Sequence, residues 1–256
     1  MRKIALLANH FPGVEISRFL ASSREDSIHA LYLVGEDSKF YDDTVQSSGV
    51  VNGNIFTGKD VFRDADHINW FKLQNFDAII CVYWPWILSS DFFSNIPITI
   101  NFHPALLPVN RGWFPHVHSI IDGSPLGVTL HKLSEKADTG EIWVQKEIKV
   151  LETEDAKEIY DRLQIEIIEL FKNNWEKITA NQIECQKQNE CSANYHKKSE
   201  INFLDEFDPK ENMSFDSFIK RLRARSFGKR SFAYYFKDGK KYFVRIQVSE
   251  KSDFRD

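Results

Sequence analysis

Short apolar runs alternate with amphipathic segments along the first part of the chain. Four runs, in which apolar side chains occupy nearly every position, lie at residues 3–8, 29–34, 77–83 and 97–102. Such runs are typical of strands that are buried on both faces of a parallel sheet. Apolar positions at helical spacing predict helices over 14–21 and 65–73, whereas the polar segment 35–58 is expected to be irregular. This alternation predicts an α/β fold with a doubly wound, mostly parallel, Rossmann-like sheet.

The same pattern continues to about residue 180. Two further strands are predicted over 128–133 and 141–148. Thr153 is expected to cap a long helix with an acidic first turn, which ends near Ile178. One face of this helix is apolar, so it is expected to pack on the core.

A different pattern begins after residue 184. The segment that follows is polar and interrupted, which predicts a linker with short ordered pieces. Ser214 is expected to cap a helix that ends near Arg225, and Asp238-Gly239 between two apolar runs is a strong hairpin signal. The expected parts are an α/β domain over 1–184, the linker over 185–213, and a small α+β module of helix and β-hairpin over 214–256.

Charge and cysteine content exclude several classes of protein. The 256 residues carry a net charge of −4 and an isoelectric point of about 6.1, which argues against a general nucleic-acid binder. Three scattered cysteines lack metal-like clustering and fit a reducing cytoplasm. No apolar stretch reaches the roughly 20 residues of a membrane span, and the first apolar run is too short for a secretory signal. We therefore expect a cytoplasmic protein that binds neither membranes nor nucleic acids.

The candidate chemistry is concentrated between residues 100 and 142. Alternation along a strand places Asn101 and His103 on one face at its carboxyl end, where open α/β sheets bind ligands. Asp138 lies in a turn that follows a later strand. An Asn amide can stabilise an oxyanion, a His can accept a proton near neutral pH, and an Asp can orient the His. This set is suited to acyl transfer to an amine. The GxGxxG and P-loop motifs are absent from the sequence, which disfavours NAD and FAD enzymes.

The segments NFHPALLPVNRG, GVTLH and ADTG, in this order, resemble the signature of the 10-formyltetrahydrofolate-dependent formyltransferase family. The resemblance spans roughly residues 1 to 180. It implies the formyltransferase fold, N10-formyltetrahydrofolate as co-substrate, and catalytic roles for Asn101, His103 and Asp138. It also implies a pterin site formed by two loops, whose matching residues are Trp84, Pro85, Trp86, Leu88, Lys132, Ala137 and Asp138.

The C-terminal segment FIKRLRARSFGKRSFAYYFKDGKKYFVRI is similar to the corresponding module of sugar N-formyltransferases. That similarity implies a dTDP-linked 3-amino- or 4-amino-dideoxysugar as acceptor, a place in bacterial O-antigen and lipopolysaccharide synthesis, and a homodimer. A nucleotide sugar needs cations for its pyrophosphate and a flat surface for its base. The candidate acceptor-binding residues are Asn9, His10, Phe11, Glu15, Asn110, Arg111, Trp113, Arg223 and Tyr234.

Two other functions stay open at this point. The acceptor amine could belong to glycinamide ribonucleotide or to methionyl-tRNA, although the acidic charge counts against tRNA. The chain could also be a non-catalytic protein that binds folate or a nucleotide sugar. His116, His118 and His131 are not spaced with acidic or Cys partners in the manner of a metal site, so no metal is expected.

Overall fold

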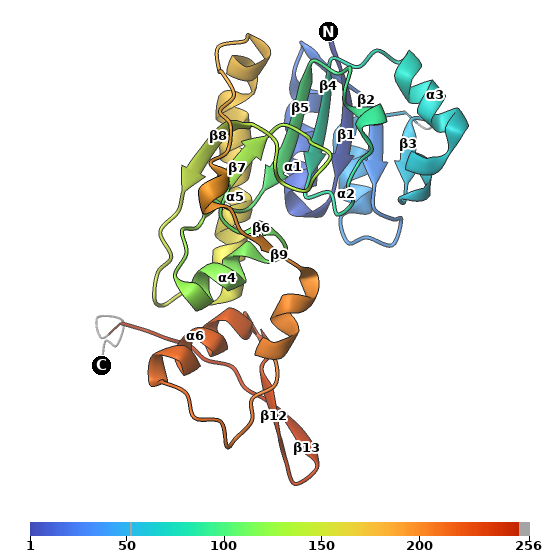
Figure 1. Cartoon of the computed structure of the whole chain (residues 1–256). Coiled ribbons are helices and arrows are strands. Elements are labelled where there is room, and N and C mark those ends of the chain that lie inside the picture. Colours follow the sequence, from blue (N-terminus) through green and yellow to red (C-terminus); the bar gives the residue numbers. More distant parts are fainter. Residues whose placement is uncertain (52, 251–256) are drawn as a thin grey trace. The chain divides into compact units, whose positions relative to one another are not determined.

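The computed structural model describes residues 1–51 and 53–250, and Figure 1 shows their fold. Residues 251–256 of the predicted C-terminal module lie outside this range. Within it, no helix combines the length and the apolar character that crossing a membrane requires. The described chain forms two compact units. The first holds residues 1–103, 129–145 and 164–188, and the second holds residues 104–128, 146–163 and 189–250.

A seven-stranded sheet is the centre of the first unit, with the strand order β3-β2-β1-β4-β5-β7-β8. Its strands are β1 (Arg2–Ala8), β2 (Asp26–Leu33), β3 (Ile55–Thr57), β4 (Ala78–Val82), β5 (Ile98–His103), β7 (Gly127–His131) and β8 (Ile142–Glu147). The five strands from β3 to β5 are parallel, and β7 runs antiparallel to β5. The predicted fold class, a mostly parallel sheet with helices and a small C-terminal module, is confirmed.

The α-helices are α1 (His10–Ser22), α2 (Tyr41–Ser48), α3 (Ala65–Leu73), α4 (Pro115–Asp122), α5 (Ala156–Thr179) and α6 (Phe215–Arg225). The 3-10 helices are η1 (Asp60–Arg63), η2 (Ser90–Phe92), η3 (Glu190–Ser192) and η4 (Lys198–Leu204). Short strand pairs complete the second unit: β6 (Arg111–Gly112) with β9 (Tyr195–His196), β10 (Ser226–Phe227) with β11 (Arg230–Ser231), and β12 (Tyr234–Lys237) with β13 (Lys240–Phe243). The predicted helix over 65–73 and the hairpin at Asp238-Gly239 are therefore confirmed.

Several predicted boundaries were wrong. Thr153 does not cap α5, because the helix begins at Ala156 and the Asp155 carboxylate accepts from the backbone N–H groups of Lys157 and Glu158. The segment 35–58 contains α2 and β3 rather than irregular chain. The positions that α2 buries are Thr44 and Ser48, so its sequence shows no apolar stripe. The first helix starts at His10 because the Asn9 side chain accepts a hydrogen bond from its backbone N–H. The apolar run 241–248 predicts that the last strand continues to residue 248, but β13 ends at Phe243.

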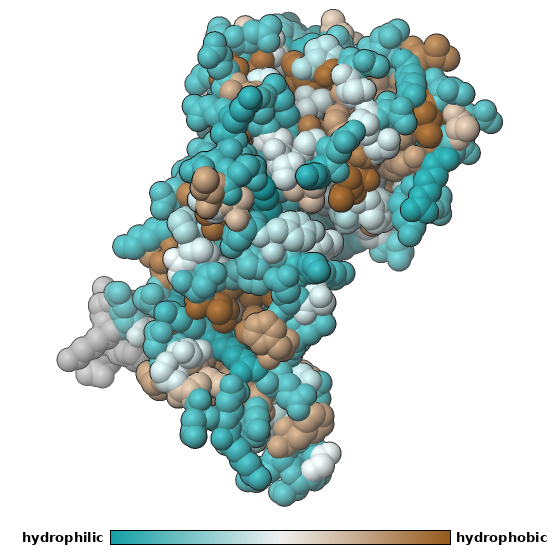
Figure 2. Space-filling model, in the orientation of Figure 1, coloured by the Kyte–Doolittle hydropathy of each residue, from teal (hydrophilic) through white to brown (hydrophobic). Residues whose placement is uncertain are grey.

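The core of the first unit explains why these strands are so apolar. The central strand β1 buries Ile4, Ala5, Leu6 and Leu7 completely, and helices pack over the sheet. An aromatic cluster that includes Tyr32 and Phe71 fills one side. Figure 2 shows hydrophilic residues over most of the visible face, with apolar residues in separate small patches. The sheet therefore provides a rigid base for side chains at the carboxyl ends of its strands.

Candidate active site

The carboxyl end of β5 carries Asn101 and His103, in the middle of the first unit's sheet. In the ladder, Asn101 lies between Cys81 of β4 and His131 of β7. His103 is 5% exposed, so it is screened from bulk water but still reaches the strand end. The alternation of the strand places both side chains on one face, as the sequence predicts.

Asp138 lies in a turn that the surrounding chain holds tightly. Its φ is +56°, in the left-handed region. The Gln188 side-chain amide donates to the carbonyl oxygens of Asp138 (2.8 Å) and Gly140 (2.7 Å). Gly140 approaches Lys132 so closely that a Cβ there would lie 1.8 Å from the Lys132 carbonyl oxygen. The turn therefore has one compact form that only glycine at 140 permits.

The Asp138 carboxylate is the point where the candidate catalytic side chains meet. Its Oδ1 lies 3.4 Å from His103 Nδ1 and 3.4 Å from Asn101 Nδ2. The His103 and Asp138 side chains are 7% and 12% exposed, so little water screens their charges. A carboxylate beside Nδ1 favours the tautomer that carries its proton there, and it stabilises an imidazolium. That tautomer leaves His103 Nε2 as a base.

His131 joins this group, although its position in the sequence suggests only a possible metal ligand. Its Nδ1 lies 2.7 Å from the Lys132 carbonyl oxygen, which can only accept, so Nδ1 carries the proton. In the neutral ring Nε2 then accepts from Asn101 Nδ2, at 3.0 Å. Asn101 Nδ2 also faces the Asp138 carboxylate, so both neighbours favour the amide orientation that presents its nitrogen. His131 is 2% exposed and thus resembles an ordinary core residue in the sequence.

The predicted pterin loop follows β4 in the first unit. The rings of Trp84 and Trp86 meet edge to face, with centroids 5.0 Å apart. Trp84 Nε1 is buried and has no hydrogen-bond partner among the described residues. Leu88 is buried, whereas Pro85 is only partly buried. The loop therefore combines apolar walls with a donor that a polar ring could use.

On the second predicted pterin loop, Ala137 is partly buried and directly precedes Asp138. Lys132 makes an ion pair with Glu141 at 2.8 Å. The hydrogen bond and the charge of Glu141 raise the pKa of Lys132. The lysine is therefore fully protonated at neutral pH, and its charge is directed at Glu141.

Four candidate acceptor residues lie where β1 leads into α1. Asn9 caps the helix and donates through Nδ2 to the Tyr83 carbonyl oxygen at 3.2 Å. The His10 ring meets the Tyr83 ring edge to face, and burial lowers the pKa of His10. Phe11 is 40% exposed. Glu15 makes ion pairs with Arg18 and Lys172.

Three other candidates occupy the second unit, in the segment between β5 and α4 that includes β6. Asn110 is completely buried, and its Nδ2 donates to the Ser119 hydroxyl at 3.0 Å. The Arg111 guanidinium makes a two-point ion pair with Glu190, at 3.0 and 2.7 Å. The ring of Trp113 is 36% exposed, and the Lys198 ammonium lies 5.0 Å from its centroid. Trp113 thus offers an accessible flat face beside a cation.

The last two candidates belong to the C-terminal part of the second unit. The Arg223 guanidinium is 3% exposed and donates to Glu152 and to the carbonyl oxygens of Leu151 and Glu154. This geometry favours a structural role in which Arg223 connects α6 to the segment 151–154, and it does not favour phosphate binding by Arg223. The Tyr234 hydroxyl donates to Glu206 at 3.1 Å, and its ring lies under the Lys241 ammonium.

Two families match this chain. Residues 46–172 match the formyl transferase family, and residues 200–250 match the N-formyltransferase dimerization C-terminal domain. The chain belongs to the formyl transferase family. The first match contains Asn101, His103 and Asp138, and the second contains α6 and the β12–β13 hairpin. The resemblance inferred from the sequence motifs is thereby confirmed.

Several known proteins are similar to this chain in part of their sequence or in their fold. A dTDP-4-amino-4,6-dideoxyglucose formyltransferase of Mycobacterium tuberculosis (strain H37Rv) is 33% identical over 148 residues, which are 57% of this chain and 63% of that relative. The crystal structure of a 4-N formyltransferase from Francisella tularensis has a TM-score of 0.82 at 24% identity, over 97% of this chain and 98% of that one. An N-formyltransferase from Helicobacter canadensis, in complex with folinic acid and dTDP-3-aminofucose, has a TM-score of 0.69 at 18% identity, over 93% of this chain and 85% of that one.

Proposed function

We propose that this formyl transferase family member is a sugar N-formyltransferase. It moves the formyl group of N10-formyltetrahydrofolate to the amino group of a dTDP-linked amino-dideoxysugar. The observation that carries the proposal is the convergence of Asn101 and His103 on the Asp138 carboxylate, in a buried position at the carboxyl end of β5. This arrangement supplies an oxyanion donor, a base and the group that orients the base, which are the groups that amine formylation needs.

The proposed reaction is an acyl transfer without a covalent enzyme intermediate. The sugar amine attacks the formyl carbon, and a new C–N bond forms. His103 accepts the proton that the amine loses, and Asp138 stabilises the resulting imidazolium. Asn101 Nδ2 keeps one hydrogen on His131 Nε2, and its second hydrogen, which faces Asp138 at 3.4 Å in the free protein, donates to the oxygen of the tetrahedral intermediate. The bond between the formyl carbon and N10 then breaks, N10 takes up a proton, and the products are a formamido sugar and tetrahydrofolate.

His131 has a positioning role in this scheme. Because its Nε2 accepts from Asn101 Nδ2, the amide is held with its nitrogen toward the reaction centre. Without this contact an Asn amide can turn and present its oxygen, which cannot stabilise an oxyanion. Asp138 opposes that turn as well, since its carboxylate would face the amide oxygen.

The loop after β4 is the proposed folate site. Trp84 Nε1 is a buried donor with no partner among the described residues, and such a donor is stabilised when a ligand acceptor reaches it. Trp86 adds a flat apolar wall beside it. Folinic acid in the Helicobacter canadensis relative supports a folate as the donor here.

The dTDP-linked acceptor rests on the relatives. The mycobacterial relative is named for dTDP-4-amino-4,6-dideoxyglucose, and the Helicobacter canadensis structure contains dTDP-3-aminofucose. We infer the same class of acceptor for this chain, whose product would enter O-antigen or lipopolysaccharide synthesis in the cytoplasm. The match of residues 200–250 to a dimerization domain supports a homodimer.

The test is an end-point assay read by mass spectrometry. The protein is incubated with N10-formyltetrahydrofolate and a panel of dTDP-, GDP- and UDP-linked 3-amino and 4-amino sugars. We expect one formyl group to be added to a dTDP-linked member, and no addition with His103→Ala. Formylation of glycinamide ribonucleotide or methionyl-tRNA alone would refute the sugar acceptor. Ligand binding without any transfer would refute catalysis.

A further inference from the structure

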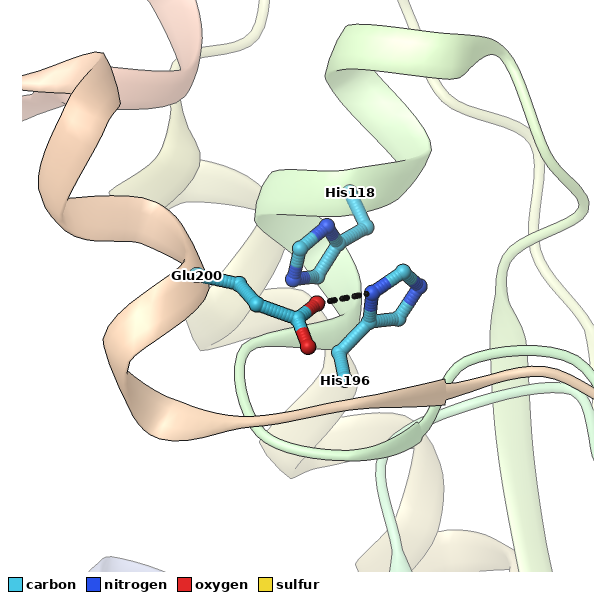
Figure 3. A group of neighbouring side chains, drawn as sticks. All are labelled: His118, His196 and Glu200. Carbon is cyan, nitrogen blue, oxygen red and sulfur yellow. Dashed lines mark hydrogen bonds and ion pairs between the residues drawn. The ribbon is translucent and has the colours of Figure 1, made fainter.

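A second cluster of ionisable side chains lies in the second unit, outside the proposed catalytic centre. His118 comes from α4, His196 from β9 and Glu200 from η4. Figure 3 shows the three side chains gathered at one place. One ligand atom from each lies within 4.8 Å of the other two. Two imidazoles and a carboxylate are a donor set that binds Zn²⁺ in proteins and leaves a fourth position for water.

The structure assigns to His118, His196 and Glu200 a binding site for one divalent cation of the zinc class. This inference goes beyond the proposed formyl transfer. Spacing along the chain does not reveal this site, since Glu200 and His196 lie far along the chain from His118 and the fold brings them together.

In His196 and Glu200, the polar atom that would not bind the cation already makes hydrogen bonds to the protein, as is usual for metal ligands. His196 Nε2 lies 3.2 Å from the Asn194 amide nitrogen, which can donate to it, and 3.1 Å from the Asn110 side-chain oxygen. His196 Nδ1 lies 2.9 Å from Glu200 Oε2, a hydrogen bond in which Nδ1 carries the proton, and a cation bound between these two atoms would replace that proton. Glu200 Oε1 accepts from the Lys197 backbone N–H at 3.0 Å, which leaves Oε2 for the cation.

His118 is the ligand that most needs a partner. Its Nε2 is buried and has no hydrogen-bond partner among the described residues. Asp122, one helical turn further along α4, adds negative charge that favours a cation.

One ring must turn before a cation can bind. The His118 and His196 rings are stacked, with planes 10° apart and centroids 3.5 Å apart. Ring lone pairs lie in the ring planes, so in this arrangement they run parallel and do not meet at one point. Rotation of the His118 ring about its Cβ–Cγ bond corrects this, and it costs Nε2 no hydrogen bond to the described residues. The bound cation would tie η4 to α4.

The experiment uses the full-length, untagged chain and Zn²⁺ or Co²⁺ alone. Zn²⁺ is titrated against the protein in competition with a chromogenic chelator, and Co²⁺ is followed by its visible absorption. We expect one cation per chain and a Zn²⁺-dependent rise in melting temperature. His118→Ala and Glu200→Gln should each weaken binding at least about tenfold and abolish the thermal shift. Glu200→Gln changes a partly exposed side chain, so it keeps the test valid if His118→Ala folds poorly.

Two control variants separate this site from other histidines. His29→Gln removes a histidine of β2 in the first unit, and His103→Ala removes the one at the proposed catalytic centre. Both should bind Zn²⁺ like the unmodified chain. Absence of stoichiometric binding would overturn the inference. Binding that survives Glu200→Gln, or that is lost in His103→Ala, would overturn it too. None of these readouts depends on formyl transfer, so failure here leaves the proposed function untouched.

Discussion

The substitution Gly140→Ala tests whether the turn that holds Asp138 sets the catalytic geometry. The added Cβ would lie 1.8 Å from the Lys132 carbonyl oxygen, whereas real Cβ atoms stay at least 3.0 Å from such atoms. The turn must therefore move by at least about 1.2 Å, the difference between the two distances. Because Asp138 lies two residues away, its carboxylate moves relative to His103. A displacement of about 1 Å can cost roughly 100-fold in rate, or about 2.7 kcal/mol of barrier.

The assay measures kcat and KM for formyl transfer to the acceptor that the panel identifies. We expect kcat to fall by about 100-fold, and the melting temperature to fall as well. Gly35→Ala is the matched control, since its Cβ would be crowded only by the movable carboxylate of Asp37. If Gly140→Ala kept full activity, either the turn would not set the position of Asp138 or Asp138 would not take part in transfer.

Four further outcomes are expected. His103→Ala should abolish turnover yet leave the dissociation constants for folate and nucleotide sugar within about threefold, as calorimetry would show; loss of binding instead would contradict its role as the base. His131→Met should lower kcat about tenfold with KM little changed. His131→Gln should keep most of the original kcat, because the Gln amide oxygen can accept from Asn101. Equal losses of kcat in both variants would argue against a positioning role for His131. The free energy of unfolding should fall as pH drops from about 6.5 toward 3, because burial lowers the pKa of His116 to about 3. In this pH range the unfolded chain takes up a proton on His116 that the folded chain does not. Urea unfolding of His116→Gln should therefore show a weaker dependence of this free energy on pH. Phe243→Asp, on the exposed β13 strand (62% exposed), should shift sedimentation from dimer to monomer, and an unchanged sedimentation coefficient would place the interface elsewhere.

The sheet could be predicted from the sequence because its strands are buried on both faces. β1 and β4 are continuous apolar runs, and such runs leave few alternatives to a covered parallel sheet. α2 could not be predicted in the same way, because its buried residues are Thr44 and Ser48 and its sequence therefore has no apolar stripe at helical spacing. β3 has three residues, too few for a periodic signal.

Part of the candidate catalytic group could also be predicted from the sequence, and part could not. Asn101 and His103 could be placed together because they are two positions apart on one strand, and Asp138 was reached through the resemblance of three separated motifs. His131 was missed as a partner of Asn101, since the contact depends on the antiparallel pairing of β5 with β7. The partners of Arg111 and His118 were out of reach for the same reason, because Glu190 and Glu200 approach only in the folded second unit.

Transfer of a labelled formyl group shows whether this protein formylates the amine of a nucleotide sugar. N10-formyltetrahydrofolate labelled with ¹³C in its formyl group is mixed with the protein and a dTDP-linked 4-amino-dideoxysugar, and the ¹³C spectrum of the sugar nucleotide is recorded over time. The account predicts a ¹³C formamide signal on the sugar, with no signal for Asn101→Ala or His103→Ala. Free ¹³C formate with an unmodified sugar, or an equal formamide signal in both variants, would contradict it.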